Sequence, residues 1–308
     1  MKKGSFRKKP APQLDPAMRF LKALHSAGAP SEMSTEELEK QRRSQEILGN
    51  LTAPMSGLRW EEFEIGPLPA AWMGLERPHR RRRALLYCHG GGYTSGNLGY
   101  SKVLASKLTH ATGLDVLSFE YRLAPEHPYP AALEDAERAW DYLMHQGYGA
   151  RDLVLAGDSA GGNLALCLCM ELRRQGRMLP GALLLMSPWT DMSASGASYT
   201  ERAEMDPMLT LEYIHAVREA YAPGLDPGSS RLSPLFGDFA CFPPTLIQVG
   251  SHEILYSDSE RLCARMKEAG VPCRLEVWED MWHVFQIFPV KKASQAMENM
   301  AQFLLEEL

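Results

Sequence analysis

Short apolar runs recur along the chain from residue 84 onward, and segments with apolar residues at helical spacing separate them. Each run is short and bounded by turn residues, which is typical of a strand. The predicted strands are Ala84–Cys88, Val116–Tyr121, Leu153–Ala156, Ala182–Met186, Thr245–Val249 and Arg274–Trp278. Between them, Leu133, Ala136, Trp140 and Leu143 follow helical spacing. This alternation predicts an α/β fold with a mostly parallel sheet that has helices on both faces.

Two amphipathic segments precede this alternation. Apolar residues recur every three or four positions between Leu14 and Leu24, and Ser34 with Glu37 has the form of a capping box before a second helix. Neither helix alternates with a strand. We therefore interpret residues 1–55 as an N-terminal tail with cap helices added to the main fold.

Residues 56–308 are interpreted as the main α/β domain, and they open with two further strands. Trp60–Ile65 and Ala70–Leu75 are separated by a turn that contains glycine and proline, and they predict an antiparallel pair at the sheet edge. The interval at about 190–240 is longer and is interrupted by four prolines. It is predicted to be a cap insertion, with a helix near Leu209–Tyr221 over the carboxyl edge of the sheet.

The composition is that of a globular protein, because 45% of the 308 residues are hydrophobic and 23% are charged. The net charge of −5 gives no reason to expect a nucleic-acid partner, and the arginine-rich run at 77–83 is interpreted as a solvated loop. No apolar run approaches the roughly 20 residues that span a bilayer, so we expect no membrane anchor. The basic start of the chain lacks the apolar stretch of a signal peptide, which predicts a cytoplasmic protein.

The six cysteines are scattered along the chain. Their spacing matches neither a zinc site nor a disulfide framework, so no metal is expected. Most of them lie inside apolar runs, and we interpret them as buried structural thiols.

The strongest chemical signal is the segment Gly157-Asp158-Ser159-Ala160-Gly161, which lies between a predicted strand and a predicted helix. A Gly-x-Ser-x-Gly segment in that setting is typical of a nucleophile elbow. The glycines remove Cβ atoms that would collide at a sharp bend, so the serine hydroxyl can project into a cleft. The N-terminal end of the following helix also favours negative charge at this place. Ser159 is therefore the candidate nucleophile.

A second signal is the segment His89-Gly90-Gly91-Gly92, directly after the strand Ala84–Cys88. Consecutive glycines let backbone N–H groups approach a ligand closely. A phosphate-binding loop is a weaker interpretation, because no Gly-Lys-Ser/Thr follows. Together with the elbow, the glycines predict an oxyanion hole that the N–H of Ala160 completes.

The candidate base is His283, which follows the strand Arg274–Trp278 by a short loop and completes the order nucleophile, acid, histidine. The acid is expected after the strand Thr245–Val249. Glu253 is the first carboxylate there, and Asp258 comes five residues later, at the predicted start of a helix. Glutamate serves as the triad acid in some hydrolases, so we favour Glu253 and keep Asp258 as the alternative.

Four segments in order carry a resemblance to a known family. They are His89–Gly92, Tyr121-Arg122-Leu123-Ala124-Pro125-Glu126, His127-Pro128-Tyr129-Pro130-Ala131 and Gly157–Gly162. Over about residues 84–305 the sequence resembles the bacterial hormone-sensitive-lipase family of α/β-hydrolases. The resemblance implies an eight-stranded hydrolase core with an N-terminal helical cap. It also implies a serine carboxylesterase that prefers short to medium acyl chains and needs no cofactor.

The resemblance also assigns roles to single residues. It implies that Ser159 is the nucleophile and His283 the base. The oxyanion donors that it implies are Gly91, Gly92 and Ala160. The family's acid is commonly the aspartate of an Asp-Pro-Leu segment, and Glu253-Ile254-Leu255 occupies that place here. Many relatives dimerise through the strand and helix at the carboxyl end, so a homodimer is expected by resemblance.

These observations lead to the hypothesis of acyl transfer in two steps, with a small-molecule ester as the substrate. Three alternatives stay open at this point. The same triad could act on a lactone, an amide or a drug-like ester. The protein could instead be a non-catalytic ligand-binding member of the fold, although such a protein is expected to lack part of the triad. It could also be a lipase acting at lipid interfaces, with an apolar face on its N-terminal helices.

Overall fold

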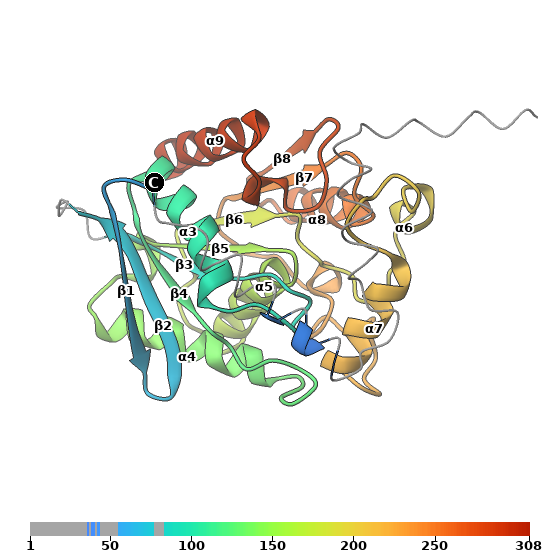
Figure 1. The fold of residues 1–308 in the computed structure, drawn as a ribbon, viewed down its shortest axis with the longest axis horizontal. Helices are drawn as coiled ribbons and strands as arrows, with labels where there is room; N and C mark the ends of the chain where they lie inside the picture. The colour runs from blue at the N-terminus through green and yellow to red at the C-terminus, as the bar shows by residue number, and fades with distance from the viewer. Residues whose placement is uncertain (1–35, 37, 41, 44–54, 77–82) are drawn as a thin grey trace, which may run out of the picture.

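The computed structural model of the protein describes residues 36, 38–40, 42–43, 55–76 and 83–308 (Figure 1). The helix expected between Leu14 and Leu24 lies outside these residues, as do most of the capping-box helix and the arginine-rich run except Arg83. The N-terminal cap expected at residues 1–55 thus falls almost entirely outside the described part of the chain.

Eight strands form one sheet in the order β1-β2-β4-β3-β5-β6-β7-β8. They are β1 (Leu58–Ile65), β2 (Leu68–Leu75), β3 (Ala84–Cys88), β4 (Asp115–Phe119), β5 (Leu153–Asp158), β6 (Ala182–Met186), β7 (Thr245–Gly250) and β8 (Cys273–Trp278). Strand β2 pairs antiparallel with β1 and with β4, and all the other pairs are parallel. The predicted α/β fold with a mostly parallel sheet is therefore confirmed.

The central strands carry the most continuous apolar runs because both of their faces are covered. Every residue of β3, β5, β6 and β7 is buried, whereas the edge strand β1 is buried only at its two end residues and the edge strand β8 has only partly buried and exposed positions. Leu155 lies at the middle of this arrangement, with Leu86 and Leu183 as its partners on either side. The core strands therefore hold their carboxyl ends, and the loops that follow them, in fixed positions.

Helices cover the two faces of the sheet. They are α3 (Leu98–Thr112), α4 (Ala131–His145), α5 (Ala160–Arg174), α6 (Ser198–Glu201), α7 (Leu211–Tyr221), α8 (Tyr256–Glu268) and α9 (Lys291–Glu307), with short 3-10 turns η1 (Ala150–Asp152), η2 (Pro234–Phe236) and η3 (Phe285–Ile287). Helices α3 and α9 pack together on one face, and α4, α5 and α8 lie on the other. None of the helices in the described ranges has the length and apolar character needed to cross a membrane.

The interval between β6 and β7 contains α6, α7 and η2 and lies beyond the carboxyl ends of the central strands (Figure 1). Helix α7 buries Tyr213, Ile214 and Val217 toward the body of the protein. The helix predicted near Leu209–Tyr221 is thus present and begins at Leu211. It forms one wall above the strand ends.

Several predicted boundaries and one burial prediction are wrong. Strand β4 ends at Phe119, and Tyr121 lies beyond it, where its hydroxyl donates to the His89 carbonyl oxygen at 2.8 Å. Strand β5 continues to Asp158, because that residue still pairs with β6. All six cysteines are free thiols, but Cys241 is exposed and Cys273 is only partly buried, so the interpretation as buried thiols holds for four of them.

The chain turns from β5 into α5 within one residue. A Cβ on Gly157 would lie 2.2 Å from the Gly161 carbonyl oxygen, and a Cβ on Gly161 would lie 2.0 Å from the Cys88 carbonyl oxygen. Both neighbours are backbone atoms that cannot move aside without disturbing the sheet or the helix. Glycine at these two positions is what allows helix α5 to start against the ends of β3 and β5.

Gly161→Ala is expected to lower the free energy of unfolding by about 3 kcal/mol or more, because overpacking against fixed backbone cannot relax. The matched control is Gly228→Ala, whose new Cβ would have its nearest contact with the Asp226 side chain, at 3.3 Å. Urea unfolding of both variants measures the difference. Equal unfolding midpoints for the two variants would contradict the steric account of the bend.

Candidate active site

Ser159 occupies the bend between β5 and α5 with φ 53° and ψ −120°. Residues other than glycine rarely adopt these backbone angles. The conformation costs on the order of 1–3 kcal/mol, and it persists only where the surrounding structure enforces it. Here the Ser159 N–H donates to the Met186 carbonyl oxygen at 2.9 Å, and the Ser159 carbonyl oxygen accepts from the Trp189 N–H at 3.0 Å. The neighbouring strand β6 and its loop therefore hold the serine in this conformation.

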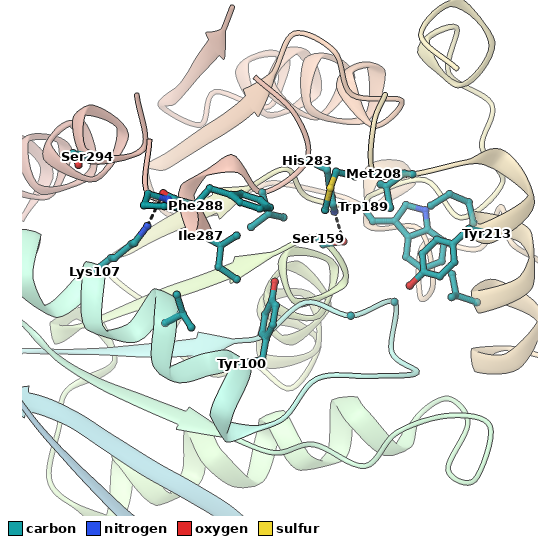
Figure 2. Close-up of a pocket in the computed structure, with 18 residues that line it drawn as sticks. Tyr100, Lys107, Ser159, Trp189, Met208, Tyr213, His283, Ile287, Phe288 and Ser294 are labelled. Carbon is teal, nitrogen blue, oxygen red and sulfur yellow. Dashed lines mark hydrogen bonds between the residues drawn. The ribbon is translucent and has the colours of Figure 1, made fainter. Parts of the chain in front are cut away.

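His283 lies within hydrogen-bond distance of the serine hydroxyl. Its Nε2 is 2.9 Å from Ser159 Oγ, and its Nδ1 is 2.9 Å from Glu253 Oε2 (Figure 2 shows the first contact). A carboxylate oxygen accepts a hydrogen bond, so Nδ1 carries the proton and Nε2 is left to accept from the serine hydroxyl. The three side chains form one continuous chain of hydrogen bonds across loops that follow β5, β7 and β8.

Glu253 is fully buried and has fixed partners of its own. Its Oε1 accepts from the Ser187 hydroxyl at 2.7 Å and from the Gly250 N–H at 2.5 Å. The Ser187 Oγ in turn accepts from the Val284 N–H at 3.1 Å, one residue after the histidine. One serine thus ties the acid loop to the histidine loop.

Asp258, the alternative acid, lies elsewhere. It belongs to the first turn of α8, where its Oδ2 accepts from the N–H groups of Thr190 at 2.8 Å and Asp191 at 2.9 Å. Burial raises the pKa of Asp258 to about 8, so this carboxyl is largely neutral at pH 7. The structure therefore brings Glu253, and not Asp258, to the imidazole.

The pKa of His283 reflects opposing effects. Burial lowers it, but the hydrogen bond and charge of Glu253 raise it, and the more distant Asp206 and Asp158 add to the increase. The net effect is a pKa above the ordinary value of histidine. A buried imidazole with a raised pKa is a better proton acceptor, and its charged form is stabilised where a reaction would create it.

The loop after β3 presents two backbone amides near the serine. Gly91 and Gly92 have φ values of 116° and 62°, and both line the same cavity as Ser159. A Cβ on Gly91 would lie 2.3 Å from the Ser95 carbonyl oxygen, so a larger residue cannot adopt this loop. The turn and loop hydrogen bonds of the described chain use none of the N–H groups of Gly91, Gly92 and Ala160 as donors. These three N–H groups can therefore donate to a developing oxyanion.

The side chain of Asp158 holds the loop after β3 through hydrogen bonds. Its carboxylate is fully buried and accepts from the Gly90 N–H at 2.9 Å, the Tyr87 hydroxyl at 2.5 Å and the Tyr100 hydroxyl at 2.7 Å. Asp158, the residue before the serine, thus holds the backbone of Gly90, which directly precedes the two candidate oxyanion glycines. Nucleophile and oxyanion loop are held in one hydrogen-bonded unit.

The N-terminal part of the chain reaches the same loop through Arg42. Its guanidinium donates to the Thr94 carbonyl oxygen at 2.9 Å and to the Ala124 carbonyl oxygen at 3.0 Å. It also pairs with the carboxylate of Glu126 at 2.8 Å, and this hydrogen-bonded pair lowers the pKa of Glu126 to about 2. Arg42 therefore joins the segments after β3 and β4.

Ser159 opens into a cavity of about 620 Å³. Figure 2 shows labelled side chains on both sides of the serine: Trp189, Met208 and Tyr213 on one, and Ile287, Phe288 and Lys107 on the other. The first side comes from the loop after β6, the segment before α7 and α7 itself, and the second from α3 and the segment around η3. The Lys107 ammonium donates to the Gln286 and Phe288 carbonyl oxygens at 2.6 and 2.9 Å. The wall is mostly apolar, which suits a ligand with hydrocarbon groups on both sides of a polar centre.

Two supporting residues, Ser187 and Asp158, were not singled out from the sequence. Both follow or end a buried strand at the carboxyl edge, where polar side chains of an α/β sheet gather. Its position directly after a buried strand is the feature of the sequence that could have indicated a role for Ser187. In the described ranges no group of three or more His, Cys, Asp or Glu side chains could hold a metal ion.

Comparisons with known proteins agree with this geometry. A family model described as the α/β-hydrolase fold matches residues 85–287. An acetyl-hydrolase of Streptomyces hygroscopicus is 39% identical over 265 residues, which cover 85% of this chain and 86% of that protein. The carboxylesterase NlhH of Mycobacterium tuberculosis is 30% identical over 295 residues, which cover 90% of each chain.

A solved structure supports the same assignment at the level of coordinates. The crystal structure of an esterase from the bacterial hormone-sensitive lipase family superimposes with a TM-score of 0.87 and 35% identity, covering 96% of this chain and 99% of that one. Sequence motifs, sheet order and overall similarity thus lead to one assignment. The chain belongs to the hormone-sensitive-lipase family of α/β-hydrolases.

Proposed function

We propose that Ser159, His283 and Glu253 carry out the ester hydrolysis of this serine carboxylesterase. The observation that carries the proposal is the unbroken hydrogen-bond chain from Ser159 Oγ through the imidazole to the buried Glu253. Each link is 2.9 Å long, and its direction suits proton transfer away from the serine.

The first half of the reaction forms an acyl-enzyme. Ser159 Oγ attacks the ester carbonyl carbon while His283 Nε2 takes the hydroxyl proton. The N–H groups of Gly91, Gly92 and Ala160 donate to the oxyanion of the tetrahedral intermediate. The imidazolium then protonates the alcohol oxygen as the bond between carbon and that oxygen breaks.

The second half releases the acid. Water attacks the acyl carbon while His283 takes one of its protons, and the same amides again stabilise the oxyanion. Collapse of this intermediate returns the proton to Ser159 Oγ and frees the carboxylic acid. Through both halves Glu253 keeps the imidazole in the tautomer that leaves Nε2 free, and it stabilises the charged ring.

We propose short- to medium-chain esters of small molecules as the substrates. The cavity has a limited volume of about 620 Å³ and a mostly apolar wall on both sides of the serine. Apolar contacts with acyl and alcohol groups supply binding energy until the chain outgrows the space.

Ser159→Ala is expected to reduce kcat/KM for p-nitrophenyl butyrate by about 10⁴-fold or more, because no other group supplies the nucleophile. Circular dichroism and thermal unfolding serve as the controls for folding. A folded variant that keeps a tenth of the wild-type rate would falsify the assignment of Ser159.

Glu253→Gln is expected to lose roughly three to four orders of magnitude in kcat, because a neutral amide no longer fixes the tautomer or stabilises the imidazolium. The matched variant is Asp258→Asn. Both backbone hydrogen bonds to the Asp258 carboxyl go to one oxygen, which an amide oxygen can replace, so near-wild-type activity is expected. The reverse pattern of losses would assign the acid to Asp258.

For a series of p-nitrophenyl esters, kcat/KM is expected to rise with acyl length by up to about fourfold per methylene and then to fall once the chain exceeds the cavity. Steady-state rates from acetate to decanoate, together with emulsified palmitate, measure the profile. Highest activity on the emulsified long-chain ester would show a lipase instead.

A further inference from the structure

Asp206 is a buried carboxylate that the reaction scheme does not use. It lies shortly after α6, between β6 and β7, and only 2% of its surface is exposed. Its own N–H donates to the Arg202 carbonyl oxygen at 2.9 Å, which anchors its backbone. A charged group in such a place must be compensated by hydrogen bonds.

Backbone donors from two separate segments provide this compensation. Asp206 Oδ1 accepts from the Met208 N–H at 2.8 Å and the Leu209 N–H at 3.0 Å. Oδ2 accepts from the Ile254 N–H at 2.8 Å, although Ile254 is 48 residues further along the chain. Each carboxylate oxygen therefore has a different partner segment.

The two partner segments both belong to the site. Ile254 directly follows Glu253, which contacts the imidazole, and it is itself fully buried. Met208 and Leu209 line the cavity into which Ser159 opens, and His283 lines the same cavity, in which Figure 2 labels both Met208 and His283. A single carboxylate thus sets the distance between the loop that carries the acid and one wall of the substrate cavity.

The charge of Asp206 also acts on His283. Three carboxyls influence the imidazole: Glu253 by direct contact, and Asp206 and Asp158 at longer range, each raising the pKa of His283. Burial raises the pKa of Asp206 itself to about 6, while its three backbone donors and His283 act to lower it. Asp206 is therefore ionised over most of the neutral and alkaline range, where the neutral imidazole works as a base.

We propose that Asp206 is a positioning residue for ester hydrolysis, which holds the Glu253 loop against the Met208–Leu209 wall and adds a negative charge that favours the imidazolium. The proposal rests on the function proposed for Ser159, His283 and Glu253. It assigns to one side chain both the geometry of the acid loop and part of the electrostatics of the base.

The decisive variant is Asp206→Asn. An amide can still accept from Met208 and Leu209 through its oxygen, but its NH₂ group then faces the Ile254 N–H and cannot accept from it. We expect kcat for p-nitrophenyl butyrate to fall on the order of 10- to 100-fold, as for a small displacement of a catalytic group.

The pH dependence separates positioning from a purely structural role. The neutral imidazole is the base, so kcat/KM rises as the pH increases through the pKa of His283. Because the charge of Asp206 raises that pKa, its removal should move the acidic limb of the profile to lower pH. The control is Asp258→Asn, which changes another buried carboxyl, one whose two backbone donors share one oxygen, and the acidic limb of this variant should stay at the wild-type position.

Asp206→Glu completes the set, because it keeps the charge but displaces the carboxylate. Its kcat should fall while its acidic limb stays near that of the wild type. Thermal unfolding identifies variants that do not fold. If Asp206→Asn is one of them, Asp206→Glu still tests the positioning role, because unchanged kcat in that folded variant overturns the proposal.

Each outcome has a defined meaning. Unchanged kcat in either folded variant overturns the proposal, and so does a loss of kcat in Asp206→Asn without a shift of the limb. Activity of the wild type that survives Ser159→Ala would instead refute the proposed function, so the two failures can be distinguished.

Discussion

The bend at Ser159 is the constraint around which the rest of the site is arranged. A non-glycine residue with φ 53° is strained, and it persists because two hydrogen bonds to the β6 side hold its backbone. The bend needs glycine on both sides, since Cβ atoms there would overlap backbone atoms at 2.0–2.2 Å. In return, it directs one hydroxyl out of the protein core toward an imidazole and three backbone amides.

Features encoded in contiguous sequence could be predicted, and features formed by distant contacts could not. The buried strands and the Gly-x-Ser-x-Gly bend depend on neighbouring residues, so the sequence indicated them directly. Strand ends depend on pairing, and β5 therefore extends to Asp158, beyond its apolar run. The hydrogen bonds from Ser187 to Glu253 and from Ile254 to Asp206 join residues that are 66 and 48 positions apart, so no local sequence pattern predicts them.

The choice between candidate acids shows the same limit in electrostatic terms. Asp158, Asp206, Glu253 and Asp258 are all buried carboxyls near the carboxyl edge of the sheet. Burial raises the pKa of Asp258 to about 8 and that of Asp206 to about 6, whereas Glu253 faces the imidazole directly. The surroundings of each carboxyl decide its part in the site, and they exist only in the folded chain. Chain order could rank Glu253 first, but only packing separates it from Asp258.

The two walls of the cavity come from different parts of the chain. One is built by α7 and the segment before it, between β6 and β7, and the other by α3 and the residues around η3. The hydroxyl, the imidazole and the amides stand on loops at the ends of the buried strands instead. Substitutions can therefore accumulate in either wall without touching the reacting atoms. Related proteins with this fold can then evolve different substrate selectivity through changes in one wall, while the residues that carry out the reaction stay the same.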